Sequence, residues 1–182
     1  MKTIKELMRH IPNARDRHLL RQFNLALGSS MIAIPSVREL ASLLGFAVDM
    51  RQLPKGVSGY LTPDTFAEKG YAIVVNRSMS VVRQRWTVLH EMGHYYLHVL
   101  TKPHDPFAPQ KNRESRGYLY FQSELLEERE ANGFADALCF GDGALTATLS
   151  GDDTDVENIA RKFGVSLSTI QRAISKYKPR MK

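Results

Sequence analysis

The sequence predicts an α+β fold, in which a small β-sheet is followed by two long helices. Apolar residues with helical spacing run through residues 80–99 and 123–140, which indicates two amphipathic helices. Between residues 47 and 76, short β-rich runs are separated by Pro, Gly and Asp turn signals, which indicates strands. A chain of 182 residues fits one domain, or one domain with a small appendage, and can bury a substantial core.

The N-terminal third has clear start and stop signals. Residues 3–27 have helical character, with a break expected near Pro12. A second helix is expected to begin after Ser36, which can cap it, and to end at Gly45. The three strand-like runs are 47–53, 56–61 and 70–76.

The C-terminal half is interrupted twice by turn-forming residues. Residues 101–117 contain three prolines and little periodicity, so a loop is expected there. Residues 141–153 are predicted to be a turn-rich connector, and 154–177 to form two short helices around Gly164. The chain is therefore expected to comprise a basic helical extension over 1–30, a core over 31–145 and a C-terminal helical segment over 146–182.

Composition and cysteine content limit the setting of the protein. With 43% hydrophobic and 24% charged residues, the chain has the composition of an ordinary globular protein. Cys139 is the only cysteine, so an intrachain disulfide is excluded and a reducing compartment is the simplest setting. The first thirty residues lack the apolar core of a signal peptide, and no later run approaches the ~20 apolar residues of a membrane span. We therefore expect a cytoplasmic protein that does not contact the membrane.

The formal charge of +6 is unevenly distributed along the chain. Residues 1–30 have six Lys/Arg against two acidic residues, residues 155–182 have seven against two, and the middle, 31–154, has twelve against fifteen. Basic ends could attract nucleic acid or an acidic protein surface. Solvated helix faces on a basic protein would produce the same pattern, so both interpretations stay open.

The segment VLHEMGHYYLH, residues 88–98, contains three of the six histidines. Residues four apart on a helix differ by about 40° around the axis and about 6 Å along it, so His90 and His94 can direct ring nitrogens at one ion. Glu91 beside them can reach a water on that ion. Two histidines and a carboxylate with HExxH spacing are the arrangement of zinc hydrolases. The alternative is that the histidines simply belong to an amphipathic helix.

His98 follows the same spacing but is not expected to share the ion. It lies eight residues from His90, roughly 12 Å along a continuous helix, whereas metal–nitrogen bonds are ~2.1 Å. A glycine turn would be needed to bring it back, and HYYLH has none. We expect His98 to lie at the helix end or behind the ligands.

The third ligand is expected on the helix over 123–140. Two histidines and one glutamate are a known catalytic zinc set that leaves a position for water. Glu127, Glu128 and Glu130 compete for this role. Glu128 has small neighbours at helical spacing, including Ala131 and Ala135, which suits close helix packing, whereas Glu127 and Glu130 suit solvated sides. Asn132, one turn beyond Glu128, could orient a ligand histidine through its other ring nitrogen.

The motifs RQRWTVLHEMGHYYLH, from residue 83, and EREANGFADAL, from residue 128, resemble those of the ImmA/IrrE metallopeptidases. That family has RF/RW-T-x-x-H-E-x-G-H-x-x-x-H and then E-x-x-A-N-x-F-A. GYAIVVN also resembles the strand that the family places before its active-site helix. The resemblance covers residues 36–140 well and 155–177 loosely. One departure is that DALCFGDG replaces the family's A-x-L-L-M-P and lacks its proline, which puts the substrate-side loop in doubt.

The resemblance implies a zincin-like core with His90, His94 and Glu128 as metal ligands and Glu91 as the general base. It also implies a zinc-dependent endopeptidase that cleaves helix-turn-helix repressors to release stress-response or mobile-element genes. Mn²⁺ is an alternative to zinc. Two histidines and a carboxylate also describe non-haem iron oxygenases, but Glu91 favours hydrolysis.

In such a mechanism an oxyanion needs a further hydrogen-bond donor. The candidates from the sequence are Tyr118, Tyr120, His98 and His104.

The C-terminal stretch NIARKFGVSLSTIQRAI has small and apolar residues at the positions that helix-turn-helix motifs require, namely Ala160, Gly164 and Ile170. One interpretation is DNA contact, or docking beside a DNA-bound repressor. The other is a structural helix pair that packs on the core. A non-catalytic regulatory module with a zincin core is the alternative to the enzyme. The exposed recognition residues would be Ser168, Thr169, Gln171 and Arg172.

Overall fold

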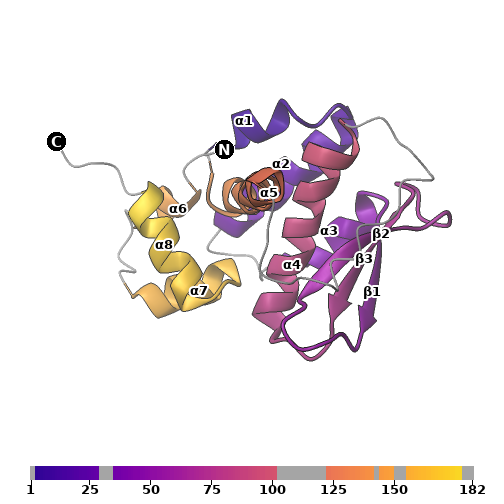
Figure 1. The fold of residues 1–182 in the computed structure, drawn as a ribbon. Coiled ribbons are helices and arrows are strands. Elements are labelled where there is room, and N and C mark those ends of the chain that lie inside the picture. Colours follow the sequence, from indigo (N-terminus) through magenta and orange to yellow (C-terminus); the bar gives the residue numbers. More distant parts are fainter. Residues whose placement is uncertain (1–2, 29–34, 102–121, 142–143, 150–154, 178–182) are drawn as a thin grey trace.

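The computed structural model describes residues 3–28, 35–101, 122–141, 144–149 and 155–177. It confirms the α+β prediction, because a small sheet lies on one side of a set of helices (Figure 1). None of the helices in these ranges has the length and apolar character needed to cross a membrane.

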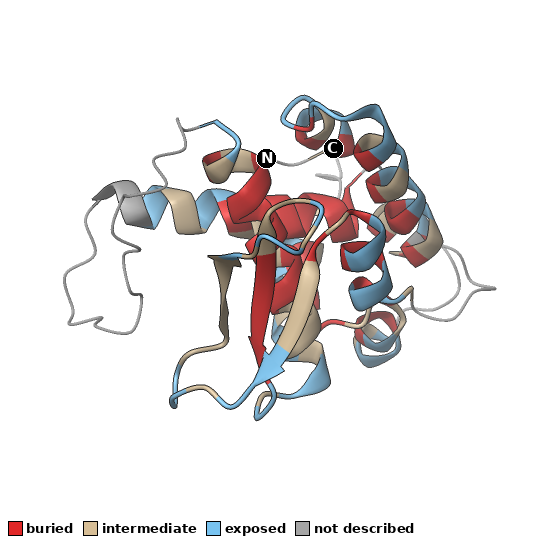
Figure 2. Cartoon of the chain, turned by 90° about the vertical axis from the view of Figure 1, so that its right-hand side faces the viewer, coloured by how far each residue is buried: buried red, intermediate tan, exposed pale blue. Residues whose placement is uncertain are grey.

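The sheet has three strands in the order β1-β3-β2. The central strand β3 is parallel to β1 and antiparallel to β2. It is the buried strand in Figure 2, which explains why its sequence is an unbroken apolar run. β2 begins three residues later than predicted and ends at Pro63, which an edge strand tolerates. The strands are β1 (Ala47–Arg51), β2 (Gly59–Pro63) and β3 (Tyr71–Asn76).

The two long helices lie as the periodicity predicts. Helix α4 (Val81–His94) continues as a π-helical turn, η1 (Tyr95–Val99), so the helical stretch predicted over 80–99 is observed with a wider last turn. Helix α5 (Gln122–Phe140) packs against α4. Figure 1 shows α4 between the sheet and α5.

The shorter helices surround this centre. The break at Pro12 separates α1 (Ile4–Met8) from α2 (Ala14–Gly28), as predicted. In α3 (Val37–Leu43), Ser36 Oγ accepts the Glu39 N–H at 3.1 Å, which confirms the expected cap. The C-terminal pair is also confirmed, with Gly164 in the left-handed conformation (φ 62°) between α7 (Val156–Phe163) and α8 (Leu167–Tyr177).

One element was missed. The connector predicted over 141–153 contains a short helix, α6 (Ala144–Leu149). Its Leu145 is fully buried in the core, so tertiary packing stabilises a helix that the turn-rich sequence does not indicate.

All three predicted segments contribute to one hydrophobic cluster. Leu20 from the N-terminal helices, Phe134 from α5 and Phe163 from α7 belong to it. Asn24 adds a buried polar link, since its side-chain amide donates to the Leu138 carbonyl at 2.8 Å. The described helices of the N-terminal and C-terminal segments are therefore packed on the core.

A buried carboxylate links α2 to the helical stretch formed by α4 and η1. Asp16 is 2% exposed, and its Oδ2 accepts from Tyr96 Oη at 2.7 Å and from Lys69 Nζ at 2.5 Å. Burial, together with the hydrogen bond to Asp16, raises the pKa of Tyr96, so the phenol stays protonated and keeps donating. The Asp16 cluster thus joins α2, η1 and the segment between β2 and β3.

We expect Asp16→Ala to lower the free energy of unfolding by about 3–5 kcal/mol, because it leaves the buried Tyr96 and the partly buried Lys69 without their acceptor. Denaturant unfolding followed by circular dichroism measures this. The matched control is Asp49→Ala, since Asp49 pairs with Arg51 at the surface and should contribute under about 1 kcal/mol. Equal losses in the two variants would contradict a structural role for the Asp16 cluster.

Candidate metal centre

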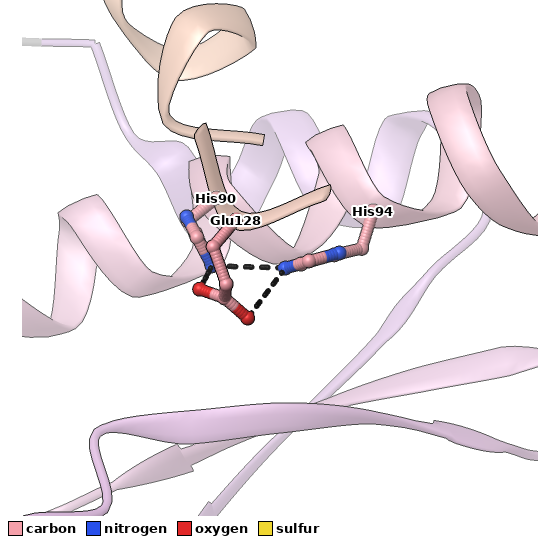
Figure 3. Close-up of side chains that lie close together, drawn as sticks. All are labelled: His90, His94 and Glu128. Atoms are coloured by element: carbon pink, nitrogen blue, oxygen red, sulfur yellow. Dashed lines mark hydrogen bonds and ion pairs between the residues drawn. The ribbon is translucent and has the colours of Figure 1, made fainter. Parts of the chain in front are cut away.

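Three ligand-type side chains from α4 and α5 converge on one point (Figure 3). His90 Nε2 and His94 Nε2 are 3.0 Å apart. Glu128 Oε2 lies 3.2 Å from His90 Nε2, and Glu128 Oε1 lies 3.4 Å from His94 Nε2. Helical spacing places both rings on the same face of α4, and the packing of α5 brings the carboxylate to them.

The spacing of these atoms fits a divalent cation. A tetrahedral ion with bonds of about 2.1 Å has ligand atoms about 3.4 Å apart, close to the three separations observed. Burial opposes ionisation of Glu128, but hydrogen bonds with His90 and His94 outweigh it and hold the pKa of this carboxyl well below its usual range. The carboxylate is therefore ionised at neutral pH, as a metal ligand must be.

The geometry selects one of the three competing glutamates. Among the residues that the structure describes, the group able to hold an ion consists of His90, His94 and Glu128. Glu130 is exposed, and its carboxylate lies 3.8 Å from His98 rather than near the other histidines. Glu127 is half-buried and contributes its backbone carbonyl to His98.

Glu91 lies next to the ligands in sequence and borders the same cleft as His90 and Glu128. It is 2% exposed, so almost all of its surface is covered by protein. A carboxylate buried at the edge of a metal-binding group is placed to exchange protons with a molecule held there.

His98 lies apart from the ligand group, as the sequence predicts. Its Nε2 is 3.3 Å from the Glu127 carbonyl, which can accept a ring N–H, and its ring centre is 5.4 Å from that of His94. Burial and the neighbouring His94 lower the pKa of His98, which favours the neutral ring, although Glu127 and Glu130 oppose this. His98 therefore links the end of the helix to α5 directly before Glu128.

Asn132 makes different contacts from those expected. Its side-chain amide donates to the Glu128 carbonyl at 2.8 Å, and its oxygen accepts from the Trp86 indole at 3.4 Å. Neither bond goes to a ring nitrogen of His90 or His94. The distance along α4 explains this, because Asn132 lies one turn beyond Glu128 and meets Trp86, one turn before His90.

The metal centre opens into a cleft of about 780 Å³. One wall is the loop 55–59 before β2, the floor is α4 and α5, and the opposite wall is the segment 165–172 of the C-terminal helix pair. Sequence reasoning missed Arg83 and Trp86, although their helical spacing from His90 was a usable signal. No local signal identifies the two walls, because tertiary packing brings them together. The oxyanion candidates Tyr118, Tyr120 and His104 lie outside the described residues.

We expect Glu128→Ala to remove most of the bound metal, because it deletes the anionic member of the ligand group. Purified variants are loaded with zinc, dialysed and analysed by mass spectrometry of the metal. Glu127→Ala, Glu130→Ala and His98→Ala serve as matched controls and should stay near one ion per chain. Loss of metal in His98→Ala with retention in Glu128→Ala would contradict this ligand assignment.

Comparison with known proteins agrees with this geometry. The family model Peptidase_M78, described as the IrrE N-terminal-like domain, matches residues 47–175. This range contains the whole sheet, both ligand-bearing helices and the C-terminal pair through Ser175. No curated protein matches the chain. Because the match spans well over half of the sequence, this chain belongs to the IrrE N-terminal-like family of metallopeptidases.

Proposed function

We propose that the protein is a zinc-dependent endopeptidase. The observation that carries this proposal is the convergence of His90, His94 and Glu128 at the floor of a cleft that Glu91 also borders. A bound metal ion could also have a purely structural role. Structural zinc sites, however, are closed by four protein ligands. Three ligands that open into a cleft suit hydrolysis better.

The residues divide the chemical work between them. A zinc ion in such a site lowers the pKa of a coordinated water and polarises a carbonyl. His90, His94 and Glu128 would hold the ion. Glu91 would take the proton from the attacking water and deliver it to the leaving amine nitrogen. Imidazole and carboxylate ligands also suit Mn²⁺, which is a second candidate for the working ion.

The substrate that the ImmA/IrrE resemblance supports is a helix-turn-helix transcriptional repressor, whose cleavage would release stress-response or mobile-element genes. A cleft that is open between two walls can also admit a polypeptide segment. A non-catalytic module that binds a repressor or DNA is the rival proposal, favoured only by the helix-turn-helix-like form of α7 and α8.

We expect Glu91→Gln to lower the rate of repressor cleavage by about 10²–10⁴-fold, because it removes the proton-accepting group and keeps the side chain's size. The protein is co-expressed with a candidate helix-turn-helix repressor, and the fragments are identified by mass spectrometry. Metal content and circular dichroism should match those of the wild type. Unchanged cleavage in this variant would favour the non-catalytic module.

Removal of the metal should abolish cleavage without a matching loss of helix. The purified protein is treated with a chelator, and cleavage and far-UV circular dichroism are recorded before and after one equivalent of Zn²⁺ or Mn²⁺ is added. The helices should be retained because the apolar core does not include the proposed ligands. We expect cleavage to return with the ion that the enzyme uses. Full cleavage by the chelated protein would exclude a metallopeptidase.

A further inference from the structure

The cleft is lined by cations that the metal chemistry does not use. Lys55, Arg83 and Arg172 all border it, and each is exposed to solvent. Among the described residues that line the cleft, the acidic ones are Glu91 and Glu128, both assigned to the metal centre. A bound divalent cation would make the interior of the cleft more positive still.

Asp136 orients Arg172 but does not neutralise it. Its guanidinium lies 3.4 Å from one oxygen of Asp136, whose other oxygen accepts from Lys176 at 2.8 Å. One carboxylate faces two cations, so this group has a net positive charge. The guanidinium also lies 5.9 Å from the ring of Trp86, and the side chain is 59% exposed. Arg172 is thus oriented and open to a ligand.

Two further cations border the cleft, one at the start of α4 and one on the segment before β2. Arg83 Nε donates to Ser58 Oγ at 3.0 Å, which joins α4 to the loop before β2. Lys55 lies on the same loop. In Figure 1 the sheet and α8 lie on opposite sides of α4, so cations border the cleft from both sides.

The helix face that would contact DNA in a helix-turn-helix protein borders this cleft. Ser168, Thr169 and Arg172 line the cavity together with His90 and Glu91. A helix that reads bases must project into a groove of the duplex. Here the same face forms the wall of a concave site, which suits an inserted polypeptide segment.

We infer that the cleft selects polypeptide segments with Asp or Glu residues close to the scissile bond. Arg172 on one side, and Arg83 and Lys55 on the other, bind these carboxylates and hold the chain across the metal centre. This inference rests on the proposed endopeptidase function and names the class of substrate that the site accepts. The cations at the rim of the cleft also speed the association of acidic substrates. The preference for acidic substrates should therefore weaken as salt screens this attraction.

The test is a cleavage-site profile. Zinc-loaded full-length protein is incubated with a peptide library made from a digested proteome, and cleaved bonds are identified by mass spectrometry. Asp and Glu should be enriched near cleaved bonds relative to the library. A cleaved acidic peptide is then resynthesised with Gln in place of Glu, and its kcat/KM should fall roughly fivefold, as expected for a partly exposed ion pair.

Matched variants assign the preference to the cleft. Arg172→Gln and Lys55→Gln should reduce the ratio between the acidic and the amide peptide towards one, because kcat/KM falls more for the acidic peptide than for the amide peptide. Arg172→Lys should retain most of the ratio. Arg161→Gln and Lys5→Gln, which remove exposed cations outside the cleft, should leave it as in the wild type. Because Lys55 lies on an exposed loop, its variant tests the inference even if changes at Arg172 disturb folding.

The outcomes are distinct. Cleavage without acidic enrichment, or a ratio that survives both Arg172→Gln and Lys55→Gln, would overturn the inference and leave the endopeptidase intact. Absence of any Glu91-dependent cleavage would overturn the proposed function, and the inference with it. Tight, salt-sensitive binding of a 20-base-pair duplex that Arg172→Gln abolishes would assign these cations to nucleic acid.

Discussion

Helices α4 and α5 approach each other so closely at Gly93 that an added Cβ would lie 3.0 Å from the Cα and carbonyl oxygen of Ala131 and from the Cβ of Phe134. His90 is three residues before Gly93, and Glu128 is three residues before Ala131. The contact between small residues therefore sets the distance between the ligands one turn away. Glycine inside a helix costs about 1 kcal/mol relative to alanine, and here the close approach requires it. Even a Cβ at this position would require Ala131 or Phe134 to move back by a few tenths of an ångström.

Close packing fixes the separation of the helices, and polar contacts at both ends of the helical stretch fix its axial position. At its start, Ser80 Oγ accepts the Arg83 N–H, and Arg83 bonds to Ser58 of the loop before β2. Beyond its end, Tyr96 in η1 bonds to Asp16 of α2. A shift by one residue is 1.5 Å, about half the separation of the ligand atoms. The N-terminal helices thus contribute to the metal centre although none of their residues lines it.

The convergence of His90, His94 and Glu128 can be predicted from the sequence because helical periodicity determines it. The spacing of His90 and His94 is local, and the small residues after Glu128 indicate the face that packs against α4. Ala131 and Ala135 are indeed fully buried. The bonds of Asn132, the helix α6 and the walls of the cleft depend on segments distant in sequence, which no local pattern brings together. The π-helical turn has no sequence signal either, because its residues have ordinary helical spacing.

The electrostatics of Asp136 explain why α8 packs on α5. This residue of α5 is 8% exposed, and a buried carboxylate is strongly destabilising unless cations pair with it. Arg172 and Lys176 of α8 supply that pairing, so the charge fixes α8 on the ligand-bearing helix. The family match extends through residue 175 and includes Arg172. The sequence unit that defines the family therefore contains the wall of the cleft opposite the sheet, and two of the basic residues of the C-terminal segment, Arg172 and Lys176, neutralise the Asp136 carboxylate.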